Sequence, residues 1–151
     1  MTDDRDAIPG SRHRLSPDDE RFLRAFGAGD LTPAEFDHRA HLRLAYIHLV
    51  QRGLDHAAGA MRDSLAGFLQ HHGIDRGKYH ETLTVAWILA VRHFMERSPA
   101  ADGADEFIDR NPMMLDSKIM LTHYSADLLF SPEARARFAE PNLDPIPRYG
   151  A

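Results

Sequence analysis

The sequence contains no cysteine, and this absence removes several classes of chemistry. Without thiols the chain cannot form disulfide bonds, use a thiolate nucleophile or build a cysteine-ligated zinc site. The absence is compatible with a reducing compartment, so we expect a cytoplasmic protein. Also missing is an apolar run of the roughly 18–20 residues that a membrane span needs, and the charged first residues lack the apolar segment of a secretory signal. We therefore expect no association with a membrane.

An excess of basic charge is absent as well, because the formal net charge at pH 7 is −5. Such a chain has no broad positive field with which to hold a phosphate backbone, so we expect no nucleic-acid partner. The composition, 43% hydrophobic and 27% charged, is that of an ordinary globular protein. A length of 151 residues is enough to bury a core, and we expect one domain.

Alternating strand patterns with hairpin turns are lacking, whereas helix starts recur along the chain. Ser16 and Thr32 each stand before a proline and have an acidic residue three positions further on, which is an arrangement that caps α-helices. Gly53 and Gly73 follow apolar helical stretches and indicate helix ends. From these signals we predict helices at about 17–27, 33–52, 54–72, 80–97, 103–110, 112–122 and 131–139.

This pattern predicts an all-α fold, a single-domain helical bundle of about five to seven helices with irregular N- and C-terminal tails. The stretch 80–97 is apolar almost all round, so we expect it to be the central helix. Leu143 and Ile146 give the C-terminal tail apolar side chains with which to lie across the bundle. The expected divisions are a disordered tail at 1–14, a helical domain at 15–140 and a proline-rich extension at 141–151.

Ten histidines are dispersed through the chain, and two of them open an apolar stretch. His38 and His41 are three residues apart, so on a helix they lie on one surface and could reach the same point. Imidazole is the commonest protein ligand for transition metals, so the pair could supply half of a metal site. Most histidine pairs of this kind are simply solvated, but the apolar residues around this one indicate a buried helix.

A second candidate group stands at the start of the most hydrophobic stretch, where Tyr79, His80 and Glu81 follow a glycine-containing loop. A carboxylate in the first turn stabilises the helix dipole, which explains Glu81 without a functional role. A cationic His80 would oppose that dipole, whereas a neutral imidazole that acts as a ligand or acceptor suits the position. Tyr124, further along the chain, could supply a hydroxyl group to the same pocket.

The pattern Phe36-x-His38-x-x-His41-Leu42, followed by Lys78-Tyr79-His80-Glu81-Thr82, resembles a group of small bacterial helical proteins. The likeness covers roughly residues 20–147, and the second motif is the more specific of the two. The resemblance implies a family and a helical fold but no reaction. It favours one pocket that is shared by the three histidines of the motifs and Glu81.

The leading hypothesis is a small helical metalloprotein that acts as an enzyme on a small organic substrate. His38, His41 and His80 would bind one divalent transition metal, namely iron, copper, zinc or manganese. Glu81 would be a fourth ligand or a general base. The metal would then help to hydrolyse or oxidise the substrate at its open positions.

Tyr79 and Tyr124 would orient the substrate in this hypothesis. Two other interpretations remain open. In the first, the protein binds a small molecule or a peptide without a metal, and the polar residues form a hydrogen-bonded network. In the second, His80 and Glu81 transfer a proton as a metal-free acid–base pair. The proline-rich tail could reach a neighbouring subunit, so a homodimer is compatible with the sequence.

Overall fold

A computed structural model describes residues 12–149, and within this range the chain forms helices and no strands. The prediction of an all-α fold is confirmed. No helix of the described range is long and apolar enough to cross a membrane. The elements, with η for 3-10 helices, are α1 (Pro17–Gly27), α2 (His38–Arg52), α3 (Leu54–His71), η2 (Arg76–Lys78), α4 (Glu81–Arg97), α5 (Ala104–Arg110), η3 (Pro112–Leu115), η4 (Ser117–Thr122), α6 (Ala126–Leu129) and α7 (Pro132–Ala136).

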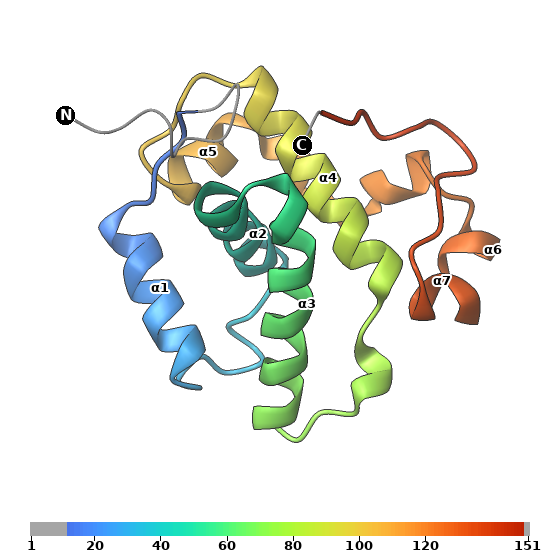
Figure 1. The fold of residues 1–151 in the computed structure, drawn as a ribbon, viewed down its shortest axis with the longest axis horizontal. Helices are drawn as coiled ribbons and strands as arrows, with labels where there is room; N and C mark the ends of the chain where they lie inside the picture. The colour runs from blue at the N-terminus through green and yellow to red at the C-terminus, as the bar shows by residue number, and fades with distance from the viewer. Residues whose placement is uncertain (1–11, 150–151) are drawn as a thin grey trace.

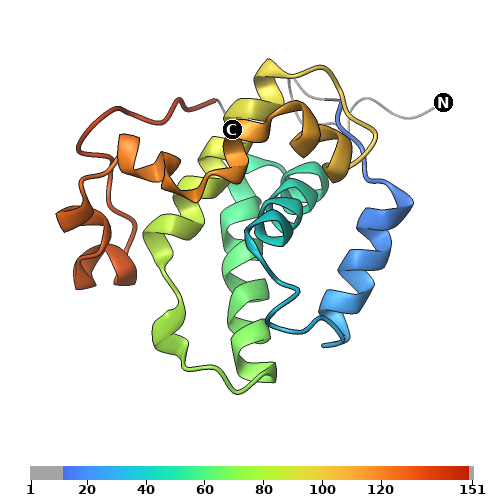
Figure 2. The ribbon, with the colours of Figure 1, turned by 180° about the vertical axis from the view of Figure 1, so that it is seen from behind.

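Helices α2, α3 and α4 pack against one another at the centre of the molecule (Figure 1). Helices α1 and α5 contact α2 on one side, and α7 contacts α4 at the opposite side (Figure 2). The main core lies between the central helices, where these large side chains are buried: Leu42, Leu44, Tyr46, Leu49, Met61, Leu65, Ile88 and Met95. A smaller core joins α4 to the C-terminal segment through Ala86, Leu89, Met120, Tyr124, Leu129 and Ile146.

Helix α1 begins where its cap predicts. The Ser16 hydroxyl oxygen accepts a hydrogen bond from the Asp19 amide at 3.1 Å, and the Asp19 carboxylate accepts one from the Ser16 amide at 3.0 Å. This reciprocal pairing satisfies two amides that have no partner inside the helix. The predicted helix at 17–27 is confirmed.

Helix α2 begins later than expected. Thr32 and Glu35 do pair, because the Thr32 amide donates to the Glu35 carboxylate at 3.0 Å, but they close an isolated turn. Asp37 is extended and caps a new helix by accepting a hydrogen bond from the Ala40 amide at 2.9 Å. The prediction of a helix over 33–37 is therefore wrong, since the second cap overrides the first.

The segment predicted as one helix at 112–122 forms two 3-10 turns instead. Asp116 separates them with an extended backbone, and its carboxylate accepts a hydrogen bond from the Lys118 amide at 3.0 Å. The short helix α6 was not predicted, and the stretch predicted at 131–139 is helical only in α7.

Both ends of the described range pack against the helices. The prediction of a disordered tail falls mainly on residues 1–11, which lie outside the described range, as do residues 150–151. His13 is buried, and its ring nitrogens pair with the Met95 carbonyl at 2.9 Å and the Ala101 amide at 3.1 Å. In the C-terminal extension Ile146 is buried in the smaller core, whereas Leu143 is 52% exposed.

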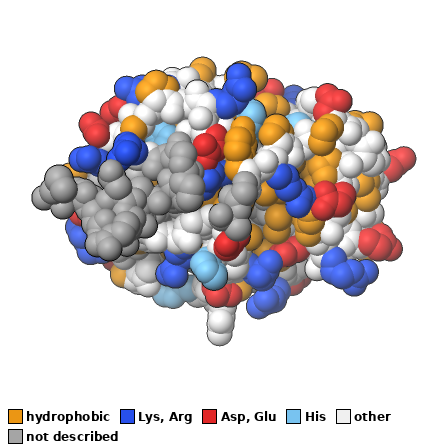
Figure 3. Space-filling view, turned by 45° about the horizontal axis from the view of Figure 1, so that its top comes forward, with side chains coloured by type: hydrophobic (Ala, Val, Ile, Leu, Met, Phe, Trp, Pro, Cys, Tyr) orange, Lys and Arg blue, Asp and Glu red, His pale blue; other side chains and the backbone are white. Residues whose placement is uncertain are grey.

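The surface carries charges of both signs. On the face drawn in Figure 3, Lys and Arg side chains are interspersed with Asp and Glu side chains, and hydrophobic side chains gather toward one end. No single sign of charge dominates this face, in agreement with the small net charge of the sequence.

Candidate functional site

A cavity of about 700 Å³ lies among the three central helices and is bordered by η2 and η4. Its size is within the range of roughly 300–1,000 Å³ that is usual for small-molecule sites. The walls are mainly apolar and aromatic: Phe36, Leu42, Met61, Leu65, Phe68, Leu83 and Trp87. Nine residues with polar or charged groups also line the cavity: Asp37, His38, His41, Lys78, Tyr79, His80, Thr84, Ser117 and Lys118.

His41 lies in the first turn of α2, and its ring stacks on Phe36 with the centroids 4.0 Å apart. Its Nδ1 lies 3.0 Å from the Asp37 carbonyl oxygen, so Nδ1 carries the proton and donates it to that oxygen. Burial lowers the pKa of His41 below its ordinary value, and the hydrogen bond to Asp37 opposes only part of this effect. The ring is therefore neutral at pH 7, and Nε2 is an acceptor at the cavity wall.

His38, the first residue of α2, joins this helix to η3. Its Nε2 donates to the Met114 carbonyl oxygen at 2.8 Å, and its ring meets Trp87 edge to face at 4.8 Å. This tautomer leaves Nδ1 as an acceptor. The two contacts fix the wall of the cavity on the α2 side.

His80 caps α4 and uses both of its ring nitrogens on the backbone. Nδ1 accepts a hydrogen bond from the Leu83 amide at 3.1 Å, and Nε2 donates to the Leu129 carbonyl oxygen at 2.7 Å. Burial lowers the pKa of His80, which keeps the ring neutral as this tautomer requires. Binding a metal through His80 would require breaking one of the two hydrogen bonds.

Glu81 lies outside the cavity lining and forms an ion pair with Arg62. Arg62 donates to its two oxygens, from Nε at 2.9 Å and from Nη2 at 2.5 Å, and the Tyr79 hydroxyl donates to it at 2.5 Å. The Arg62 hydrogen bonds lower the pKa of Glu81, with a smaller contribution from Tyr79. Burial and the bond to Glu81 raise the pKa of Tyr79 to about 12. In this arrangement Glu81 is an ionised partner of Arg62 rather than a free general base.

Tyr124 is fully buried in the smaller core, away from the cavity. Its hydroxyl donates to the Ala139 carbonyl oxygen at 2.7 Å, and burial raises its pKa to about 12. This hydroxyl therefore ties the C-terminal segment to the smaller core and does not face the cavity.

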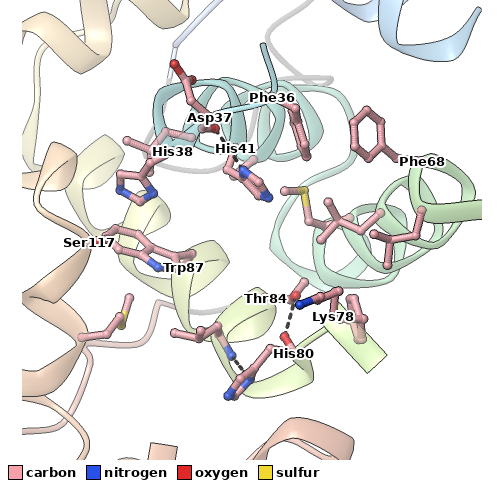
Figure 4. A pocket seen from close by; sticks show the side chains of 18 of the residues that line it. Phe36, Asp37, His38, His41, Phe68, Lys78, His80, Thr84, Trp87 and Ser117 are labelled. Atoms are coloured by element: carbon pink, nitrogen blue, oxygen red, sulfur yellow. Dashed lines mark hydrogen bonds between the residues drawn. The ribbon is translucent and has the colours of Figure 1, made fainter. Parts of the chain in front are cut away.

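The six predicted site residues are thus divided by the fold. Four line the cavity, namely His38, His41, Tyr79 and His80. Two lie outside its lining, namely Glu81 and Tyr124. Figure 4 shows His38 and His41 on one side of the cavity and His80 on the opposite side. Within residues 12–149, no three histidine, aspartate or glutamate side chains are placed so that they could hold a metal ion together.

The cavity also has lining residues outside the six predicted site residues, above all Lys78 and Lys118. In the sequence, Lys78 is notable only as the first residue of the Lys78-Tyr79-His80-Glu81-Thr82 motif, and Lys118 resembles a solvated surface residue. The signal that could have identified them is scarcity, because they are the two lysines among 18 basic residues. Trp87, the single tryptophan, lines the cavity for a different reason, since it stands on the central helix α4.

Comparison with protein-family models, with curated protein sequences and with solved structures finds no match for this chain. The resemblance to small bacterial helical proteins therefore stays a prediction, as do cytoplasmic location and a homodimer. What the protein does has to be inferred from the cavity.

Proposed function

We propose that this protein binds a small, largely hydrophobic organic molecule in the cavity among α2, α3 and α4. The observation that carries the proposal is an opening of about 700 Å³ with aromatic and aliphatic walls. The opening is large enough to hold a small organic molecule, since sites of that kind usually have volumes of roughly 300–1,000 Å³. Apolar walls with few polar groups are the usual composition of a small-molecule site.

His41 would give this site its specificity. Its neutral ring presents Nε2 as an acceptor, while Nδ1 is held by the Asp37 carbonyl oxygen. A hydroxyl or N–H group on the ligand could donate to Nε2, whereas a purely apolar molecule would leave that nitrogen without a partner. The stacking of His41 on Phe36 keeps the ring in this orientation.

A fluorescence titration with N-phenyl-1-naphthylamine, an uncharged aromatic dye that brightens in apolar surroundings, tests the proposal. We expect saturable binding of one dye molecule per chain with a Kd in the range of about 1–100 μM. Ala45 lines the cavity and is 2% exposed, so the variant Ala45→Phe should fill part of it and weaken binding about ten-fold or more. Thermal unfolding of the variant checks that it remains folded.

A matched pair of surface variants controls for non-specific binding. Phe130 and Met113 are both 62% exposed, but only Phe130 lines the cavity. We expect Phe130→Ser to weaken dye binding and Met113→Ser to leave it unchanged. Dye binding that is not saturable, or that the folded variant Ala45→Phe retains in full, contradicts the proposed function.

One observation favours metal binding by His38 and His41 as a second candidate. Each ring pairs one nitrogen with a backbone carbonyl oxygen, which is how metal-bound histidines are commonly oriented, and each has a second nitrogen for a ligand bond. Elemental analysis of untagged protein, purified without a metal column or chelator, tests this candidate beside His41→Ala. Near-stoichiometric iron, copper, zinc or manganese that the variant loses would support it. Protein that contains none of these metals and takes up none would contradict it.

A further inference from the structure

The lysines of this chain are confined to the cavity. Among 18 lysines and arginines, the sequence has only two lysines, Lys78 and Lys118, and both line the cavity. No arginine of the described residues lines it. At every other position counted as lysine or arginine the chain has arginine, so both of its lysines lie beside the same opening.

The two kinds of cation also differ in what they bind. Arg39, Arg43 and Arg62 all form ion pairs with carboxylates, whereas between residues 12 and 149 neither lysine has a carboxylate partner. The single carboxylate of the lining, Asp37, already accepts the Ala40 amide as the cap of α2. Apart from its histidines, the lining has two lysines and one aspartate and so carries one net positive charge, although the whole chain has a net charge of −5.

The backbone holds both lysines in place while their side chains remain exposed. Lys78 ends η2, and Arg135 fixes this turn from α7 by donating to the Gly77 carbonyl oxygen at 3.0 Å. Lys118 stands in the first turn of η4, where its amide donates to the Asp116 carboxylate at 3.0 Å. Figure 4 shows Lys78 on one side of the cavity and Ser117, the neighbour of Lys118, on another. The backbone of each lysine is thus fixed beside the cavity, and its side chain is exposed to solvent.

We propose that the ligand of this cavity is an amphiphilic acid, with a hydrophobic body and a single acidic group such as a carboxylate that Lys78 or Lys118 binds. The assignment rests on the proposed function, because it specifies the ligand of the same cavity. The hydrophobic body lies against Phe36, Phe68 and Trp87, and the acidic group stays at the rim, where its charge remains partly solvated.

The charge of the lining fits one acidic group better than a polyphosphate. One net positive charge balances one anion, and the described lining has neither the arginine fork nor the glycine-rich loop that usually hold phosphate groups. Lysine acts as a point charge with three donors and no fixed plane, so it binds carboxylates of varied orientation.

Two dyes with the same aromatic body test the charge requirement. Anilinonaphthalene-8-sulfonate carries one negative charge, and N-phenyl-1-naphthylamine is its uncharged counterpart. We expect the sulfonate dye to bind roughly ten-fold more tightly than the neutral dye, which corresponds to one charge-assisted contact at a partly solvated rim. Added salt should weaken binding of the sulfonate dye and leave the neutral dye almost unaffected.

The variants Lys78→Gln/Lys118→Gln and Arg76→Gln/Arg137→Gln remove the same charge from different places. Both arginines are exposed and outside the lining, and Arg76 even belongs to the same turn as Lys78. We expect the lysine variant to abolish the preference for the sulfonate dye and the arginine variant to keep it. The single lysine variants show how the preference divides between the two ammonium groups.

The possible results distinguish the acidic nature of the ligand from small-molecule binding itself. Equal affinity for the two dyes, or a preference that the double lysine variant retains, overturns the assignment of an acidic ligand while the small-molecule function stands. Failure of both dyes to bind overturns the proposed function and the acidic ligand with it. Loss of the preference in the arginine variant as well shows a general effect of net charge and also overturns the role of the lysines.

Discussion

Cations lie on two sides of helix α2, and they differ in whether the protein itself supplies a carboxylate partner. On the side of α1 and α5, Arg39 and Arg43 bind three carboxylates, those of Asp19, Asp105 and Asp109. We call these five residues the acidic clamp. Asp19 is its centre, because its carboxylate is fully buried and also accepts the Ala104 amide at 2.9 Å. In the clamp, each cation has carboxylate partners within the protein, and these ion pairs join three helices.

On the side of the cavity, the cations have no carboxylate partner among the described residues. His41 has an acceptor nitrogen at the wall, and Lys78 and Lys118 have no carboxylate partner in the described range. Groups at the cavity that have no partner within the protein are available to a ligand, and we propose that one binds there. The difference separates charges that stabilise the fold from charges that remain for a ligand.

We expect the largest effect from a variant that removes Asp19, the centre of the acidic clamp. The variant Asp19→Ala removes one of the two carboxylates that Arg43 binds and leaves the Ser16 and Ala104 amides without their acceptor, so we expect a loss of about 3–5 kcal/mol in the free energy of unfolding. Asp18→Ala is the matched control on the same helix, where the side chain is 62% exposed, and should cost less than about 0.5 kcal/mol. Urea unfolding measures both, and similar losses would contradict the role of Asp19.

Acid should weaken the contact between α2 and α3. His48 is buried, its Nε2 pairs with the Ser64 hydroxyl at 2.9 Å, and its Nδ1 has no hydrogen-bond partner in the described range. Burial, aided by the positive charge of Arg52, lowers the pKa of His48 from 6.5 to about 4. Between these values the unfolded chain binds more protons than the folded one, so stability falls as the pH falls.

The expected contribution of His48 is a loss of roughly 2 kcal/mol as the pH falls from 6.5 to about 5. The variant His48→Gln cannot bind this proton, so its stability should depend less steeply on pH over the same interval. Urea unfolding at several pH values compares the two slopes. Equal slopes would show that His48 is not buried as a neutral ring.

Glu81 tests whether a predicted catalytic carboxylate belongs to the fold or to the cavity. The variant Glu81→Gln weakens the bonds from Arg62 and Tyr79, and we expect a cost of about 1 kcal/mol because Arg62 is 43% exposed to solvent. Affinity for N-phenyl-1-naphthylamine should not change, since Glu81 lies outside the lining. A large loss of dye affinity without a loss of stability would place Glu81 in the site after all.

We expect the smallest effect on stability from the lysine variants, which test whether the two lysines stabilise the fold. Lys78→Gln and Lys118→Gln should each change the free energy of unfolding by less than about 0.5 kcal/mol, because neither ammonium group has an ion-pair partner in the described range. Thermal and urea unfolding measure this directly. A loss comparable to that of the clamp variant would mean that the lysines stabilise the fold and are not reserved for a ligand.

Local signals predicted the fold better than the site. The cap at Ser16 fixed the start of α1, because all of its partners lie within one turn of the chain. At α2 two caps compete, and only the packed structure shows that Asp37 begins the helix rather than Thr32. Threonine and aspartate are both common caps, and the sequence gives no measure of which one is favoured here.

The site depends on contacts between distant residues. The sequence indicates that a neutral ring suits position 80, but the acceptor of its Nε2 proton, the Leu129 carbonyl oxygen, is 49 residues away. The pairing of Glu81 with Arg62, across two helices, likewise removes it from the cavity. Neither partner can be identified from spacing, so the sequence placed His80 and Glu81 in one site that the fold divides.

The confinement of lysine to the cavity rim has a consequence for proteolysis. An enzyme that cleaves after lysine can cut this chain at only two peptide bonds, those that follow Lys78 and Lys118. Both bonds border the cavity, and the first lies in the connection that joins α3 to α4. The rate of that cleavage, measured by mass spectrometry as the loss of intact protein with time, would show whether the cavity of the unlabelled protein is occupied.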